Sequence, residues 1–111
     1  MKENMWPIVL FNGTVATTNG LYEITDIAID TAKELLQTYG FISAIGHEAT
    51  ATIMRELLEQ LIVMNRIQFH QEVGQIAIVF KLNERPDEGV VLNRAEVEQI
   101  GYCLKKMVRI L

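Results

Sequence analysis

The stretch whose residue types could do chemistry is Gly46-His47-Glu48-Ala49-Thr50. The preceding segment, 41–45, is apolar and partly β-branched, whereas apolar residues recur at helical spacing after it. His47 is therefore expected where an extended segment becomes a helix, beside the unpaired N–H groups of the helix N-terminus. Gly46 allows close approach of the backbone there. Such a corner attracts phosphate, and histidine is the commonest general acid in enzymes.

Each feature of this junction also has a structural explanation. Glycine is common before a helix, Glu48 in the first turn suits the helix macrodipole, and Thr50 can bond a free N–H. His47-Glu48 also matches half of the zinc-protease motif. The second histidine of that motif would fall at position 51, which is Ala51. We therefore expect no metal site and no cofactor.

The composition limits the possible classes of protein. A chain of 111 residues is expected to form one domain over 1–111, and its 50% apolar content is typical of a globular protein. A net charge of −4 argues against a general surface for duplex nucleic acid but leaves room for a local basic pocket. The single cysteine, Cys103, fits a reducing compartment. No apolar run could span a membrane, and no signal peptide is recognisable, so we expect a soluble cytoplasmic protein.

The hydrophobic pattern predicts an α/β (α+β) domain with a mixed, mostly antiparallel five-stranded sheet and about three packed helices. The expected strands are 8–11, 21–24, 65–71, 75–82 and 102–111, and the expected helices are 29–39, 48–60 and 93–101. Segment 76–80 is apolar on both faces and is expected at the centre of the sheet. Segment 102–111 carries several lysines and is expected at an edge. Asn93 and Glu96 match a capping box.

Polar side chains are expected to converge at the ends of the strands. Alternation places Lys81, Asn83 and Arg85 on one face as their strand leaves the core. The same reasoning places Arg66, Gln68 and His70 together on the segment expected beside it.

Four segments together resemble the ring nuclease family of archaeal viruses, phages and mobile elements, which acts as an anti-CRISPR against type III systems and has YddF-like bacterial relatives. They are Leu10-Phe11-Asn12, Ser43-Ala44-Ile45-Gly46-His47-Glu48-Ala49-Thr50, Asn65-Arg66-Ile67 and Arg85-Pro86-Asp87-Glu88-Gly89. Their order and spacing agree with the family over nearly the whole chain.

The resemblance implies a homodimer with a central pocket that binds the second messenger cyclic tetra-adenylate and cuts it, without metal, into linear di-adenylates. His47 matches the family's catalytic histidine and Glu88 its glutamate. The side chains expected to line the pocket are those of Asn12, Thr50, Arg66 and Arg85, with Lys81 where a polar residue contributes. Gly46 is expected to contribute its backbone. Ala49 departs from the pattern, because relatives commonly have serine there.

The implied reaction is chemically consistent with these residues. A ribose 2′-hydroxyl attacks the adjoining phosphorus, the 5′-oxygen leaves with a proton from His47, and a 2′,3′-cyclic phosphate remains. Glu88 would orient the imidazolium, and Arg66 and Arg85 would hold phosphate oxygens.

Two other readings stay open. The same pocket would serve a protein that sequesters a cyclic oligonucleotide without cutting it. Alternatively, the chain is a structural or interaction protein of a mobile element, and Arg85 with Glu88 forms only a surface ion pair in a charged turn.

Overall fold

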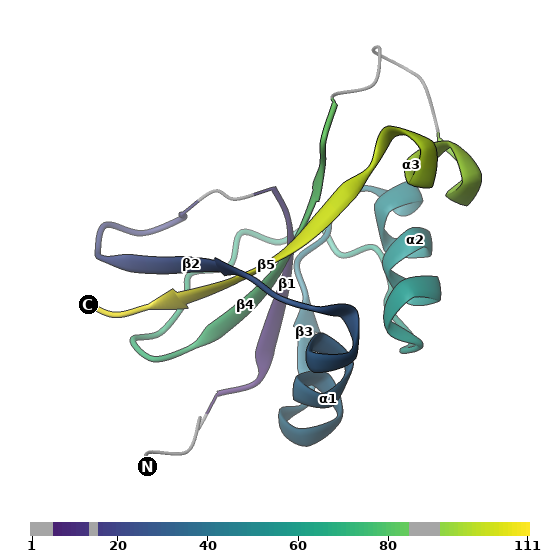
Figure 1. The fold of residues 1–111 in the computed structure, drawn as a ribbon. Helices are drawn as coiled ribbons and strands as arrows, with labels where there is room; N and C mark the ends of the chain where they lie inside the picture. Colours follow the sequence, from purple (N-terminus) through teal and green to yellow (C-terminus); the bar gives the residue numbers. More distant parts are fainter. Residues whose placement is uncertain (1–5, 14–15, 85–91) are drawn as a thin grey trace.

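Parallel pairing of three strands forms the centre of the fold. The computed structural model describes residues 6–13, 16–84 and 92–111. β1 (Ile8–Asn12) lies between β3 (Phe41–Ser43) and β4 (Ile76–Leu82), and both pairings are parallel. β5 (Tyr102–Arg109) and β2 (Tyr22–Asp26) add antiparallel pairings on the other side of β4. The result is a five-stranded mixed sheet of order β2-β5-β4-β1-β3 (Figure 1).

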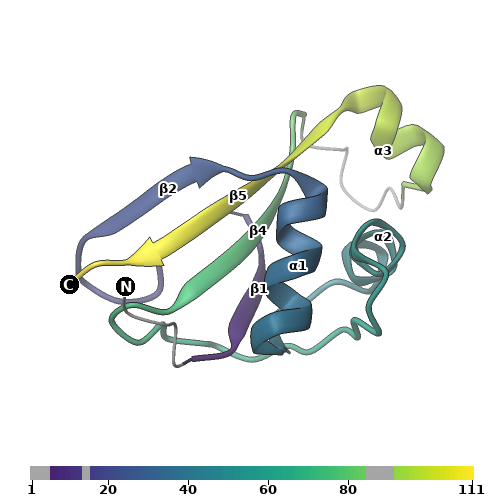
Figure 2. The same ribbon diagram turned by 60° about the horizontal axis from the view of Figure 1, so that its bottom comes forward.

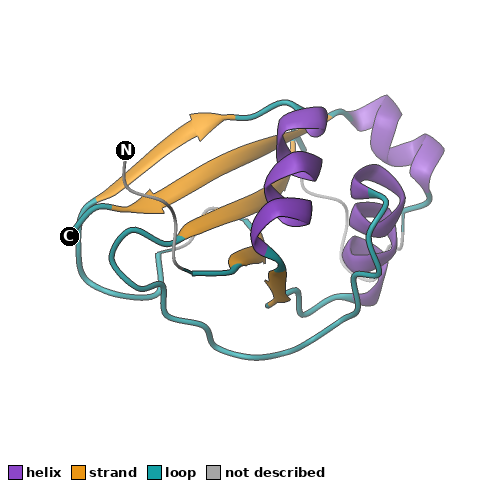
Figure 3. Ribbon diagram, turned by 90° about the horizontal axis from the view of Figure 1, so that it is seen from below, coloured by secondary structure: helices purple, strands orange, loops and turns teal. Residues whose placement is uncertain are grey.

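Three helices cover one face of this sheet. α1 (Ile29–Tyr39), α2 (Glu48–Leu58) and α3 (Arg94–Ile100) contribute buried apolar side chains to one core cluster, which also holds side chains of β1, β4 and β5. α1 and α2 run beside one another on that side (Figures 2 and 3). None of the helices in the described part of the chain has the length and apolar character that crossing a membrane requires.

A second, smaller cluster lies on the opposite face. It contains Val9, Phe11, Ala77, Val79 and Met107, which alternate along their strands with residues of the larger cluster. The partly buried ring of a phenylalanine from the long loop between α2 and β4 packs against it. β1 and β4 are therefore buried on both faces, as their continuous apolar sequences predict.

Most elements lie where the sequence predicts them. All three expected helices are confirmed, and β4 has the expected central position. The capping box is confirmed, because the Glu96 N–H donates to Asn93 Oδ1 at 2.8 Å and the Asn93 N–H donates to Glu96 Oε1 at 3.2 Å. The sheet is mixed, as expected. Antiparallel pairing does not dominate, however, because two of the four strand pairs are parallel and two are antiparallel.

The strand expected at 65–71 is absent, and β3 is the fifth strand instead. β4 pairs with β1 along one edge and with β5 along the other, so it has no free edge for this segment. The turn at the end of the segment does form, because the Gln75 N–H donates to Glu72 O at 2.9 Å and Gly74 has φ +88°. The alternating residues belong to a loop that crosses the smaller core cluster.

The expected edge position of the last strand is also wrong, because β5 lies between β2 and β4. Lys105 of β5 forms an ion pair with Asp26 of β2, so it does not serve to prevent another chain from pairing with a free edge. The edge strand on this side of the sheet is β2, of which all residues but Tyr22 are exposed, and β3 is the edge strand on the other side.

Met107→Ala tests the interior position of β5. Met107 is fully buried, so its truncation leaves a cavity and should lower the free energy of unfolding by about 2–5 kcal/mol in urea denaturation. The control is Ile24→Ala on β2, where the side chain is 47% exposed and the expected change is within about 1 kcal/mol. Equal losses for the two variants would contradict the strand order.

Candidate functional site

The ends of the three parallel strands define the edge of the sheet where the expected site residues lie. β1, β3 and β4 run in one direction, so their carboxyl ends share an edge. The chain leaves β3 at Ser43 and enters α2 at Glu48, which brings the N-terminus of α2 to that edge. Ligands of open sheets with parallel strands bind at this position, because loops and helix N-termini gather there.

His47 is the N-cap residue of α2. Its backbone is extended (φ −128°, ψ 127°), its side chain makes no capping hydrogen bond, and its imidazole is exposed. The first helical hydrogen bond runs from the Ala51 N–H to His47 O at 3.0 Å. The N–H groups of 48–50 therefore have no partner within the helix and carry its positive dipole end. The predicted arrangement of an imidazole beside free N–H groups is therefore present. We call this junction, Gly46 to Thr50, the corner.

Arg66 is held over this corner by the loop that follows α2. The Asn65 N–H donates to Ile45 O at 2.7 Å, and the Asn65 side chain donates to Ser43 O at 2.9 Å. These bonds fix the loop beside the connection between β3 and α2. Arg66 Nε then donates to Gly46 O at 2.8 Å, and its other two nitrogens make no hydrogen bond to the described residues.

Gly46 makes this close contact possible. A Cβ atom at position 46 would lie 3.3 Å from Cγ of Arg66, tighter than an ordinary carbon–carbon contact. Gly46, which was expected to let the backbone approach a ligand, therefore also leaves space for the methylene groups of Arg66.

Asn12 joins the end of β1 to α2. Its Nδ2 donates to Thr50 Oγ1 at 3.3 Å, and both side chains reach the surface. The structural explanation for Thr50 was a hydrogen bond to a free helix N–H, whereas the contact of its side chain in the structure is with Asn12. Five of the expected residues, namely Asn12, Gly46, His47, Thr50 and Arg66, thus meet at one edge of the sheet.

The charges around the corner favour an anion. Lys33, Arg55, Arg94 and Lys105 each pair with a carboxylate, and a hydrogen bond to Asp26 raises the pKa of Lys105. Arg66 has no carboxylate of the described residues within ion-pair distance. Its charge is therefore available to a ligand.

Lys81 lies apart from this group. It is exposed, and alternation along β4 places it with Ala77 and Val79 on the face opposite the helices. Asn12 lies two residues after Leu10 on β1 and therefore shares the helix-facing side of the sheet with it. Lys81 therefore ends at the same edge of the sheet as Asn12 but on its other face.

Two expected site residues, Arg85 and Glu88, lie outside the described residues. Within the described ranges, no group of three or more histidine, cysteine, aspartate or glutamate side chains is arranged to hold a metal ion.

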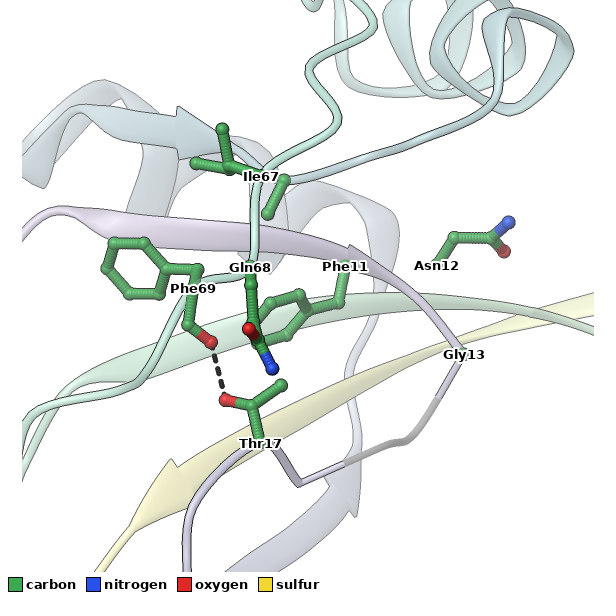
Figure 4. Close-up of a pocket in the computed structure, with 8 residues that line it drawn as sticks. Phe11, Asn12, Gly13, Thr17, Ile67, Gln68 and Phe69 are labelled. Atoms are coloured by element: carbon green, nitrogen blue, oxygen red, sulfur yellow. Dashed lines mark hydrogen bonds between the residues drawn. The ribbon is translucent and has the colours of Figure 1, made fainter.

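A pocket of about 320 Å³ opens beside the corner, on the face of the smaller core cluster (Figure 4). It is lined by Phe11, Asn12, Gly13, Thr17, Ala44, Ile67, Gln68 and Phe69. Asn12 lines the pocket and bonds to Thr50 of the corner. Sequence reasoning missed Phe69, because the loop that carries it was predicted to be a strand.

Comparisons with known proteins place this fold among viral and bacterial proteins. The sequence model described as STIV B116-like matches residues 8–104. The chain is similar to B116 of Sulfolobus turreted icosahedral virus, whose structure superposes with a TM-score of 0.70 at 19% identity over 93% of this chain and 99% of that one. At this identity the structural similarity supports the fold alone.

Sequence similarity extends to three further proteins. Protein 26 of Sulfolobus islandicus filamentous virus (isolate Iceland/Hveragerdi) is 44% identical over 69% of this chain and 66% of its own length, just under two thirds. YddF of Bacillus subtilis (strain 168) is 34% identical over 93% of this chain and 97% of its own length. ORF117 of Acidianus two-tailed virus is 35% identical over 80% and 79%, respectively.

Titration with inorganic phosphate tests the corner as an anion site. The backbone amide resonances of 48–50 should shift in ¹H–¹⁵N spectra, because their N–H groups point to solvent at the helix N-terminus. Arg66→Ala should weaken this binding about threefold or more, since it removes a charge-assisted contact. Lys106→Ala removes the same charge from β5 and should leave the affinity unchanged. Equal effects of the two variants would contradict the site.

Proposed function

The chain belongs to the STIV B116-like family, and we propose that it is a metal-independent ring nuclease that cleaves cyclic tetra-adenylate to linear di-adenylates with 2′,3′-cyclic phosphate ends. One observation carries the proposal. An exposed imidazole stands at the N-cap of α2, beside helix N–H groups without a side-chain cap and below an arginine fixed to Gly46 O. These are the parts needed to bind a phosphodiester and to protonate its leaving oxygen.

The reaction needs no group beyond those of the substrate and the protein. A phosphate oxygen accepts hydrogen bonds from the first N–H groups of α2 and from Arg66, which neutralise the charge that develops on the phosphorane. The ribose 2′-hydroxyl attacks the phosphorus in line, and its proton passes to solvent. The bond to the 5′-oxygen breaks as His47 donates a proton to that oxygen. The products are a 2′,3′-cyclic phosphate and a free 5′-hydroxyl.

The remaining expected residues receive roles in this proposal. Asn12 and Thr50 support the phosphate side of the corner through their shared hydrogen bond. Glu88 orients the imidazole and Arg85 binds a second phosphate oxygen, both from the segment between β4 and α3. Lys81 adds positive charge from the other face of the sheet.

A homodimer would complete the site. A ring with four phosphates has approximate rotational symmetry, and a C2 dimer presents each corner twice to such a ligand. The corner is open to solvent in one chain, because His47 and Arg66 are both exposed. A second copy would cover it and strengthen the electrostatic contacts by excluding water.

Destruction of this messenger in the cytoplasm would counteract type III CRISPR defence. Two of the three proteins that are similar in sequence come from viruses, which supports a role on the side of a mobile element.

Incubation with labelled cyclic tetra-adenylate in EDTA tests the activity. Wild-type protein should release di-adenylates, and His47→Ala should cleave about 10²–10⁴-fold more slowly while still binding the ring, because only the proton donor is lost. Gln37→Ala changes an exposed side chain of α1, away from the corner, and should keep most of the activity.

An intact ring after prolonged incubation with the wild-type protein would contradict the nuclease proposal. Tight binding of the ring without turnover would instead identify a sequestering protein, and no binding of any cyclic oligoadenylate would point to an interaction protein.

A further inference from the structure

Aromatic and polar side chains together line the pocket beside the corner. Two phenyl rings form part of its wall, those of Phe11 and Phe69, with centroids 6.4 Å apart and planes inclined at 59°. Phe11 belongs to the buried core, whereas Phe69 is only partly buried and faces the pocket from the loop. A partly exposed aromatic ring such as that of Phe69 offers a surface on which a nucleobase can stack.

The wall opposite the strands is tied in place by two contacts. Thr17 Oγ1 donates to Phe69 O at 2.5 Å, as drawn in Figure 4, and His70 Nδ1 lies 3.0 Å from Thr17 O. Segments far apart in the sequence are thereby joined across the pocket mouth. The pocket is consequently built by tertiary contacts rather than left between two independent loops.

Gln68 adds a polar side chain to the pocket beside those of Asn12 and Thr17, which already bond to Thr50 and Phe69. Its side chain is exposed and has no hydrogen-bond partner within the described ranges. In the view of Figure 4 it extends from the loop toward Thr17. A primary amide offers one acceptor and two donors in a plane, and it can therefore meet a base edge that carries a donor next to an acceptor.

Adenine presents this pattern. Its N6 amino group donates beside the acceptor N7, so a glutamine amide bonds it bidentately. Guanine has two acceptors, O6 and N7, at the same edge and would leave the amide oxygen facing another oxygen. At this Hoogsteen edge, the amide of Gln68 thus distinguishes the two purines.

The position of the pocket relates it to the phosphate corner. Asn12 lines the pocket and also donates to Thr50 in the first turn of α2. Gln68 follows two residues after Arg66, which is anchored to Gly46 O. A nucleotide with its phosphate at the N-terminus of α2 would have its base directed along this loop.

We propose that this pocket is an adenine-binding subsite and that Gln68 is its specificity-determining residue. The assignment deepens the proposed nuclease function and rests on it for the identity of the cyclic substrate. The base site itself is tested with a mononucleotide and does not require cleavage.

The first experiment titrates the full chain with 5′-AMP and with 5′-GMP and follows the resonances of Phe69 and of the Gln68 side-chain amide. AMP should bind about tenfold more tightly than GMP, and Gln68→Leu should reduce this preference to about twofold or less. Gln37→Leu, a change of the same type at an exposed position of α1, should retain it. Absence of AMP shifts in the pocket, or an unchanged preference in Gln68→Leu, would overturn the proposal.

The second experiment measures cleavage of cyclic tetra-adenylate by the same variants. Gln68→Leu should raise KM about tenfold and leave kcat within about twofold, because it removes a binding contact and no reacting group. A loss of kcat with unchanged KM would contradict a base-recognition role.

The two proposals fail separately. An intact ring together with selective AMP binding would reject the nuclease and retain the base subsite. Efficient cleavage without any effect of Gln68→Leu on KM or on AMP binding would reject the subsite and retain the nuclease.

Discussion

The parallel pairing of β1 with both β3 and β4 is the constraint on which the rest of the structure depends. It forces the carboxyl ends of three strands to one edge, and the short connection after β3 then delivers the N-terminus of α2 there. Burial of β1 on both faces stabilises this arrangement, because its side chains contribute to both core clusters. The polar residues at the edge are consequently carried by rigid elements whose positions are set by the core.

Local electrostatics at this edge differ from the average for the chain. The protein has a net charge of −4, yet several of its cations away from the edge are matched by carboxylates. The helix dipole of α2 and the guanidinium of Arg66 reinforce each other at one place. An anionic ligand is therefore attracted by the charges close to it. The repulsion from the more distant negative charges of the protein is screened by salt beyond a Debye length.

The sequence predicts the local elements and the corner but not the complete topology. Helical periodicity and capping residues such as Asn93 act over short distances, so all three helices are recognisable. The errors concern long-range pairing. Segment 65–71 has the alternating pattern of a strand because Phe69 packs inward against the face of the sheet. The segment does not pair with β4, because β1 and β5 already occupy both edges of that strand. No local sequence pattern reveals this. Likewise, Lys105 has the character of a lysine on an edge strand, and only the tertiary structure shows that Asp26 of the neighbouring strand is its partner.

The same distinction applies to the site. His47 and Gly46 could be found because a glycine before a helix is a local signal, whereas the bond from Asn12 to Thr50 joins residues 38 positions apart. The pocket beside Asn12 depends on contacts between residues 52 and 53 positions apart and could not be predicted from spacing.

The most direct test of the α2 corner is a crystal structure with the 2′-deoxy analogue of cyclic tetra-adenylate, which lacks the attacking hydroxyl and stays intact. The account predicts a phosphate on the first N–H groups of α2 and a ring nitrogen of His47 within about 2.6–3.2 Å of a 5′-oxygen. A ligand bound elsewhere, with His47 directed to solvent and α2 free of phosphate, would contradict it.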